Sequence, residues 1–315
     1  MVATGTPQAR AGASRPGVRT AKPRGRRVGS GGRVGYLFVA GYTILLLLFG
    51  VAPAAYALWL SVTNSSGQLT GLGNFTRVFA DYRFGSAFAH IGVYLTLWLG
   101  SLMVLVVTLA LLLHGRLKRT SAVVRFLCYL PGAFAGASSV LIWLILLDPV
   151  ASPVGPVLRA VGWSSAAQVV APENLPAIFT IIAFWTGAGS WIVIIHGALN
   201  GIPNEVIEAA RIDGAGAVQI ALRIQLPMLR KWIAYMLILA FAGGAQLFVE
   251  PQLVGTASFG QVPDDWSPNQ LSYQFAFVAA DFNGAAAIAV VLLVLSLGCA
   301  AAAVFKAGLF ERDHS

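Results

Sequence analysis

Six long stretches of the chain contain no Lys, Arg, Asp or Glu, and shorter polar segments separate them. A charged side chain at the centre of a bilayer costs at least ~2.5–3.5 kcal/mol on insertion scales, so uninterrupted stretches of this kind mark membrane spans. About 20 residues of helix cross the hydrocarbon core. The pattern therefore predicts an all-α, polytopic membrane protein with transmembrane helices at 34–62, 86–114, 122–147, 176–200, 229–250 and 284–306.

The composition agrees with this pattern and excludes two other classes of protein. Of the 315 residues, 57% are hydrophobic and 10% are charged, and the mean hydropathy is +0.75. A soluble domain carries about 25% charged residues, and a disordered chain exposes far less apolar surface. Cys128 and Cys299 each lie inside an apolar run, which argues against a disulfide or a zinc site. We expect no metal and no cofactor.

The net charge of +9 is explained by where the basic residues lie. If both termini are cytoplasmic, 18 of the 21 Lys and Arg residues lie on the cytoplasmic side, as the positive-inside rule requires. The basic charge therefore needs no nucleic-acid partner. Residues 1–33 are rich in Gly, Arg, Pro, Ser and Ala and are expected to form a disordered cytoplasmic tail, while 307–315 form a short cytoplasmic C-terminus.

The connection between the fourth and fifth spans, residues 201–227, is unlike a passive loop. Pro203 suits the first turn of a helix, and Ala209 and Ala210 are strong helix formers with small side chains. Asp213-Gly214 predicts the end of that helix, because glycine readily adopts the left-handed conformation found there. A second amphipathic piece is expected from about Gly216 to Leu226, ending at Pro227. From the residues alone, a membrane-surface helix that only solvates the loop fits equally well.

The same segment resembles a known motif. Its letters run Glu208-Ala209-Ala210-x-x-Asp213-Gly214-Ala215 and then Ile224-x-Leu226-Pro227. This string resembles the EAA loop of binding-protein-dependent ABC importer permeases, and its spacing matches the carbohydrate-uptake branch. The resemblance extends to Gly71-Leu72-Gly73-Asn74-Phe75, to Leu130-Pro131 and to Phe282-Asn283-Gly284-Ala285, and covers roughly 36–306.

The resemblance implies a permease subunit of an ATP-driven importer in a bacterial inner membrane. The chain has no GxxxxGK[ST] phosphate loop, so ATP hydrolysis is expected on two separate ATP-binding subunits rather than on this chain, which is not an enzyme. The implied partners also include a second, non-identical permease subunit and an extracytoplasmic solute-binding protein. Closure of the ATPases would move the EAA helix and so drive alternating access in the permease domain, 34–306. The implied coupling residues are Glu208, Ala209, Ala210, Asp213, Gly214, Ala215, Leu226 and Pro227.

The resemblance also favours a sugar, or a related polyol or sugar phosphate, as the transported solute. Sugar sites combine aromatic faces with polar groups that bind hydroxyls. Residues of these types on and near spans four to six are candidates for the substrate pathway: Trp185, Trp191, Gln246, Glu250 and Asn283. Each also has a structural explanation, because tryptophans are common at membrane interfaces and a carboxylate at a span end can simply face water.

Two other classes of membrane protein compete with this interpretation. An intramembrane serine protease would need Ser190 and His196 within hydrogen-bond reach, but six residues apart on one helix they point in different directions. An ion-coupled secondary carrier or a channel remains the alternative, with His90 as the clear ionisable residue within a span.

Overall fold

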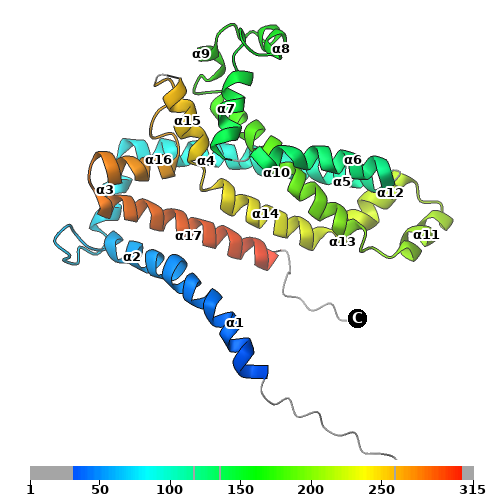
Figure 1. Ribbon diagram of the computed structural model, residues 1–315, viewed down its shortest axis with the longest axis horizontal. Coiled ribbons are helices and arrows are strands. Elements are labelled where there is room, and N and C mark those ends of the chain that lie inside the picture. The colour runs from blue at the N-terminus through cyan, green and yellow to red at the C-terminus, as the bar shows by residue number, and fades with distance from the viewer. Residues whose placement is uncertain (1–30, 116–117, 135, 259, 307–315) are drawn as a thin grey trace, which may run out of the picture. The chain divides into compact units, whose positions relative to one another are not determined.

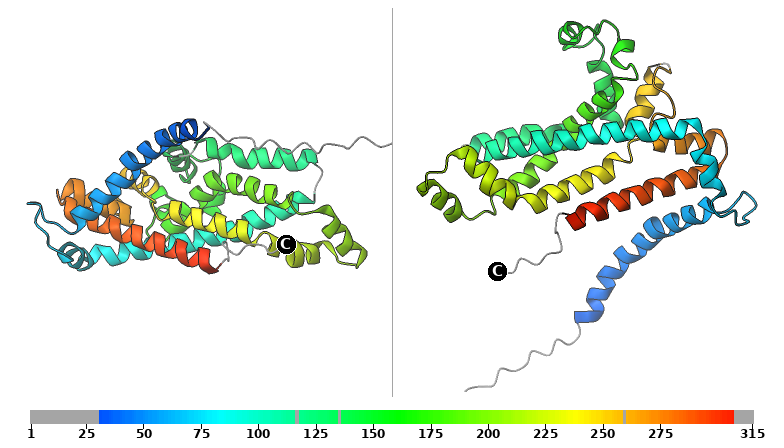
Figure 2. Two further views of the ribbon diagram at one scale, coloured as in Figure 1. Left: turned by 90° about the horizontal axis from the view of Figure 1, so that it is seen from below. Right: turned by 180° about the vertical axis from the view of Figure 1, so that it is seen from behind.

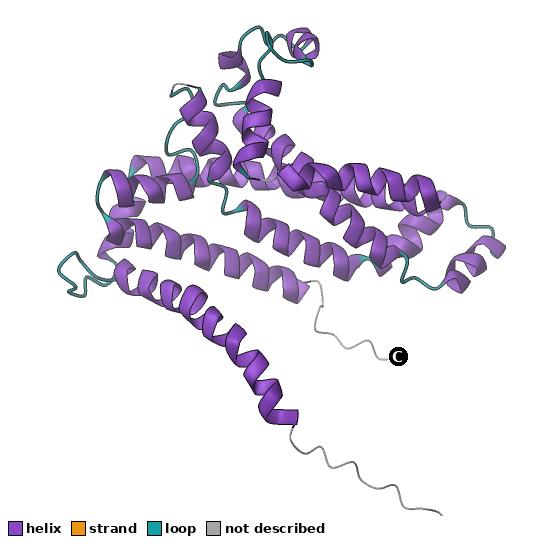
Figure 3. Cartoon of the chain, in the orientation of Figure 1, coloured by secondary structure: helices purple, strands orange, loops and turns teal. Residues whose placement is uncertain are grey.

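The computed structural model describes residues 31–115, 118–134, 136–258 and 260–306, and in these residues helices are joined by loops and turns (Figures 1 and 3). Within them the β-type pairing is one isolated bridge between Thr63 and Leu69. The expected tail falls largely outside the described residues. Its last three residues instead begin the first helix, and the expected C-terminus at 307–315 lies outside the described part.

The helices divide between two compact units that meet at Ala52 and Pro53. The first unit contains α1 (Gly31–Leu46), η1 (Leu47–Val51) and the first residue of α2 (Ala52–Ser61). The first half of the second unit adds α3 (Gly73–Phe79), α4 (Tyr82–Ser101), η2 (Leu102–Val106), α5 (Val107–His114), α6 (Lys118–Tyr129), η3 (Leu130–Phe134), α7 (Ala137–Leu146), α8 (Gly155–Ala160) and α9 (Ala166–Val169). The remainder consists of α10 (Leu175–Leu199), α11 (Asn204–Ile212), α12 (Ala217–Ile220), η4 (Ala221–Gln225), α13 (Leu226–Met228), α14 (Arg230–Gly244), α15 (Val249–Ala257), α16 (Pro268–Tyr273), η5 (Gln274–Val278) and α17 (Phe282–Lys306).

The predicted spans are found, four as unbroken helices and two as bent pairs. The unbroken helices long and apolar enough to cross a membrane are Val39–Ser61, Tyr82–His114, Leu175–Leu199 and Phe282–Phe305. The bent pairs are Arg119–Phe134 with Ala137–Leu146, and Ala217–Met228 with Arg230–Gly244. Counting each pair as one span gives up to six in the described residues, which confirms the polytopic, all-α class.

The third and fifth spans differ from the straight helices that the charge-free runs predict. In the third span, α6 is followed by the 3-10 helix η3, which begins at Leu130-Pro131. The next helix, α7, begins after Gly136, whose φ is +80°, and it is bent by 105° from the helical segment before the break. Proline cannot donate the next helical hydrogen bond, and glycine tolerates the positive φ, so the two residues break the span. The fifth expected span, 229–250, is cut short because α14 ends at Gly244 and a separate helix, α15, begins at Val249.

The core of the second unit is built around α10. Phe179, Ile182, Ile192, Ile195 and Leu199 of this helix are all almost fully buried. Close helix approach depends on glycines with no room for a Cβ. A Cβ on Gly189 would overlap the backbone of Cys128, and one on Gly244 would lie 2.9 Å from Leu95 Cδ2 and 3.1 Å from Trp98 Cδ1.

The second unit has two distinct ends (Figures 1 and 2). The helices α3 and α16 and the start of α17 lie at one end, whereas α11 and α12 lie at the other. The helices α7 and α15 project to the same side of the bundle. Residues 201–227, which we call the coupling segment, are therefore separated from the α3–α16 end by the length of the long helices.

Candidate coupling and transport sites

The coupling segment forms the predicted helix, elbow and second helix. The first helix is α11, and its last turn is closed by backbone N–H groups: Asp213 donates to Ala209 O at 3.0 Å and Ala215 donates to Ala210 O at 2.9 Å. Gly214 has φ +84°, the left-handed conformation that favours glycine. The sequence-based prediction of a helix stop at Asp213-Gly214 is therefore confirmed.

Most of the surface of α11 is exposed, while its half-buried Ile207 packs against the core around α10. The helix has no buried residue, Glu208 and Ala209 are exposed, and Ile212 is 87% exposed. Glu208 and Arg211, three residues apart on this helix, do not form an ion pair with each other. The helix thus offers a carboxylate, small alanines and an exposed apolar side chain to a neighbouring molecule.

The second piece of the coupling segment is longer than predicted. It runs through α12, η4 and α13 to Met228, so Pro227 lies within it rather than at its end. The Leu226 N–H bonds to Ala221 O, five residues back, and this wider π-type turn accommodates a proline ring that would clash in a regular turn. The chain bends by 65° before α14, at Leu229, which is 1% exposed.

The substrate-pathway candidates occupy separate places. Trp185 packs edge-on against Trp143 with ring centroids 5.8 Å apart, and Trp191 packs against Tyr235 at 6.4 Å. Gln246 is exposed just beyond α14. No hydrogen bond or ring contact joins any two of the five candidates in the described residues. Their shared role stays a prediction.

Glu250 lies on α15 and not at the outer end of the fifth span, where the sequence placed it. The residue is half-buried, and burial raises the pKa of its carboxyl above the ordinary value. A carboxyl group in such surroundings can both donate to and accept from a hydroxyl when it is protonated.

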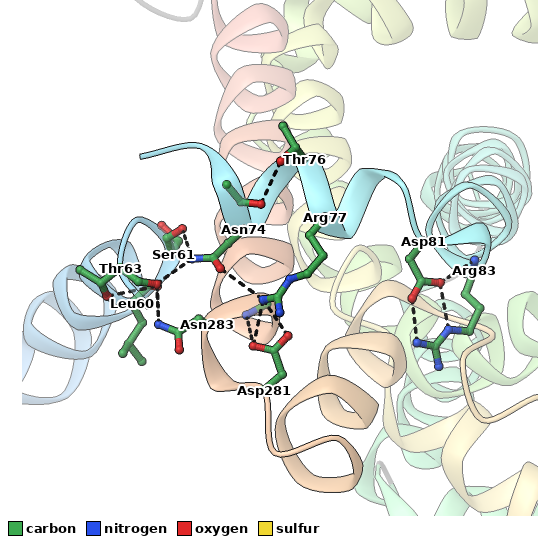
Figure 4. A network of polar contacts seen from close by, with 12 residues as sticks. Leu60, Ser61, Thr63, Asn74, Thr76, Arg77, Asp81, Arg83, Asp281 and Asn283 are labelled. Atoms are coloured by element: carbon green, nitrogen blue, oxygen red, sulfur yellow. Dashed lines mark hydrogen bonds and ion pairs between the residues drawn. The ribbon is translucent and has the colours of Figure 1, made fainter. Parts of the chain in front are cut away.

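Asn283 has a structural contact that the sequence did not predict. Its side-chain amide donates to Leu60 O at 2.9 Å and to Thr63 O at 2.8 Å (Figure 4). Asn74 donates in the same way to Ser61 O at 3.0 Å and Thr63 O at 2.8 Å. The sequence signal was available, because both asparagines belong to the segments that resemble the permease family, but nothing in the sequence showed that these segments meet.

A bundle of apolar helices with an exposed helix–elbow–helix segment at one end is the architecture of a multi-span membrane protein. Residues 115–307 match the family described as binding-protein-dependent transport system inner membrane component, and the chain belongs to this family. It is therefore an inner-membrane permease component that works with a solute-binding protein. Membership confirms the resemblance seen in the sequence and favours it over an ion-coupled carrier or channel.

Relatives of known function are of the same kind. The chain is 27% identical over 271 residues to the sn-glycerol-3-phosphate transport system permease protein UgpA of Yersinia pestis, covering 84% of this chain and 90% of the relative. It is 28% identical over 269 residues to UgpA of Escherichia coli O6:K15:H31, covering 82% of this chain and 89% of that protein.

Two solved structures share the fold. One is a bacterial ABC transporter that imports the acidic polysaccharide alginate, with a TM-score of 0.71 and 21% identity over 90% of this chain and 96% of that one. The other is a bacterial alginate ABC transporter in complex with an alginate pentasaccharide-bound periplasmic protein, with a TM-score of 0.70 and 21% identity over 86% and 92% of the two chains.

Proposed function

We propose that the chain is the permease subunit of an ATP-driven importer for a sugar, a polyol or a sugar phosphate. The observation that carries this proposal is α11, an exposed helix ended by Gly214 at one end of a bundle of family-matching helices. Such a helix has the shape and surface to enter a cleft on a separate ATPase subunit. The similarity to UgpA supports a phosphorylated polyol or a related carbohydrate as the solute.

In this proposal the exposed carboxylate of Glu208 makes a charge-assisted contact with a basic group of the ATPase. Ala209 and Ala210 allow close approach, and Gly214 sets the angle at which α12 leaves. Asp213 and Ala215 close the end of the helix, and Leu226 and Pro227 carry the second piece toward α14. Closure of two ATPases would then rock the bundle between its inward-facing and outward-facing states.

The rest of the assembly follows from the same proposal. Both termini lie in the cytoplasm with α11, in agreement with the distribution of basic residues. A second, non-identical permease subunit completes the pathway, and an extracytoplasmic protein delivers the solute. Trp185, Trp191, Gln246 and Glu250 remain the proposed contacts along the pathway, whereas the amide of Asn283 is engaged by backbone carbonyls.

The coupling role is tested with two variants that make the same change of charge. Glu208→Lys alters the exposed face of α11, and Glu173→Lys alters an exposed residue outside the coupling segment. We expect Glu208→Lys to lose co-purification of the ATPase and at least tenfold of ATP-dependent uptake in proteoliposomes, with Glu173→Lys unchanged. Wild-type uptake by Glu208→Lys would refute the proposal.

The solute class is tested through the binding protein that selects it. A thermal-shift screen would compare sn-glycerol 3-phosphate, neutral sugars and acidic oligosaccharides with amino acids and metal ions, and uptake of each hit would then be measured in the complete complex. A shift produced only by amino acids or metal ions would contradict a carbohydrate-type solute.

A further inference from the structure

The C-terminal end of α2 is capped by side chains from distant parts of the second unit. The last carbonyls of a helix have no partner within it and need donors from elsewhere. Here Leu60 O, Ser61 O and Thr63 O receive side-chain amide hydrogens from two asparagines (Figure 4).

These asparagines converge on one acceptor. Asn74 of α3 and Asn283 of α17 each donate to Thr63 O at 2.8 Å, and only 7% and 9% of their surfaces are exposed. A carbonyl oxygen has two lone pairs, so these donors use its full capacity. Because the amides are buried, separating them from Thr63 would leave polar groups without water to replace the lost bonds.

An ion pair joins the elements that carry the asparagines. Arg77 of α3 lies 2.8 Å from the Asp281 carboxylate, and it also donates to Asn74 Oδ1 at 3.2 Å. Asp281 accepts from Gly284 N at 2.9 Å and so caps the beginning of α17. Asn74, Arg77, Asp281 and Asn283, together with the carbonyls at the end of α2, form what we call the outer clamp.

The outer clamp lies beside its own apolar cluster. Val78, Ala87, Leu271, Phe275 and Ile288 are buried together there, in a group distinct from the larger core around α10. A Cβ on Gly284 would lie 2.6 Å from Phe275 Cδ1, so α17 starts in close contact with η5. Polar bonds and close packing thus fix the same end of the bundle.

We propose that the outer clamp is a fixed pivot, which stays closed while the rest of the permease changes between its two facing states. The proposal rests on the proposed transport function and goes beyond it by assigning positioning roles to four residues. It requires the end of α2, α3 and the start of α17 to move as one body. The motion driven from α11, at the opposite end, then takes place elsewhere in the bundle.

The decisive experiment replaces the ion pair with a covalent link. In a background where Cys128 and Cys299 are changed to Ser, Arg77→Cys and Asp281→Cys are introduced together and joined with a short bifunctional thiol reagent. Uptake is measured in proteoliposomes of the complete complex. We expect the unlinked double variant to lose several-fold in maximal uptake rate, and the linked protein to regain most of it.

The opposite result would overturn the proposal. If the clamp must open during transport, the linked complex will show less uptake than the unlinked one. The Cys-free complex carrying native Arg77 and Asp281 is treated with the same reagent as the control. If that control shows no uptake at all, the transport function itself fails, which is distinguishable from failure of the pivot.

A second pair of variants separates positioning from loss of folding. Arg77→Asp and Asp281→Arg are each expected to lower the maximal uptake rate several-fold, without changing the affinity of the complex for the solute-loaded binding protein. The double swap, Arg77→Asp with Asp281→Arg, is expected to recover part of the rate, because it restores the ion pair but not the hydrogen bond to Asn74 or the cap on Gly284 N. No recovery in a swap variant that assembles to the normal level would count against the clamp.

Discussion

At the residue scale, the closest helix contacts depend on single glycines. Gly189 of α10 faces the backbone of Cys128 and Tyr129, with no space for a side chain. Gly187 and Gly244 approach Trp98 of α4 from two other helices, and their Cβ atoms would lie 3.2 Å and 3.1 Å from its ring. The packing of three helices around this tryptophan is therefore set by the absence of side chains.

Replacement of Gly189 is expected to destabilise the bundle. In Gly189→Ala the new methyl group meets backbone atoms that cannot rotate away, and overpacking of this kind costs about 1–3 kcal/mol. Gly243→Ala is the matched control, because nothing lies within 4 Å of its Cβ position. Thermal unfolding in detergent should show a lower midpoint for Gly189→Ala only. Equal midpoints for both variants would contradict the close contact.

Asp81 is expected to make stability depend on acid pH. Its side chain accepts from Arg83 N at 2.9 Å at the start of α4, and the hydrogen bond from the Arg83 guanidinium lowers the pKa of the carboxyl. Since the folded pKa lies below the unfolded value of about 3.9, this contribution is complete above that pH and is lost as the pH falls through the folded pKa.

The corresponding variant is Asp81→Asn, which keeps a capping oxygen but removes the charge. The unfolding midpoint of the wild-type protein should fall more steeply below about pH 4 than that of the variant. The two curves should run parallel above about pH 6. A variant whose midpoint falls as steeply as the wild type in acid would show that this carboxylate does not contribute.

At the scale of elements, Gly214 belongs to a sequence motif and has a left-handed backbone conformation. Its φ of +84° is one that other residues adopt at a cost of about 1–2 kcal/mol. Gly216 lies two residues further on with φ −73°, where it caps α12 and an Asp is well tolerated. These neighbours therefore form a natural pair for testing the elbow.

Gly214→Asp is expected to abolish ATP-dependent uptake while the protein still inserts into the membrane. The substitution changes the direction in which α12 leaves α11, and it does not touch a span. Gly216→Asp adds the same side chain nearby and should leave uptake close to the wild-type rate. Membrane fractionation and uptake assays measure both effects. If the two variants behave alike, the left-handed glycine is not what matters.

The existence of these elements could be predicted from sequence, but their breaks could not. Charge-free runs located all six hydrophobic regions, and the Asp213-Gly214 pair located the end of α11. Hydropathy carries no information on the direction of a helix axis, so it did not predict the 105° bend near Pro131 and Gly136. The outer clamp was missed for a related reason, because its two asparagines lie in segments far apart in the chain and only folding brings them to Thr63 O.

At the scale of the whole molecule, large apolar side chains remain exposed on several helices. Phe126 of α6, Ile145 of α7 and Leu297 of α17 are 65%, 62% and 61% exposed. In an inner-membrane component, exposed apolar surfaces of this kind suit contact with lipid tails.

The energy source for uptake distinguishes the proposed importer from a secondary carrier. We expect uptake in proteoliposomes of the complete complex to require ATP and the co-purified ATPase subunits, and to persist when ionophores collapse proton and sodium gradients. The matched control omits ATP from the vesicles and keeps the gradients. Uptake driven by a gradient in the absence of nucleotide would contradict the ATP-driven mechanism.

The bend at Leu229 determines how a movement of α11 would be transmitted to the membrane-spanning helices. Gly214 is exposed, so the elbow beside it can flex in solvent, whereas Leu229 is embedded in the main core. Because the residue at this bend is packed in the core, the bend is rigid, and the segment before it and α14 have to rotate together. A movement of α11 would thus rotate α14, the helix that packs closely against Trp98 at Gly244.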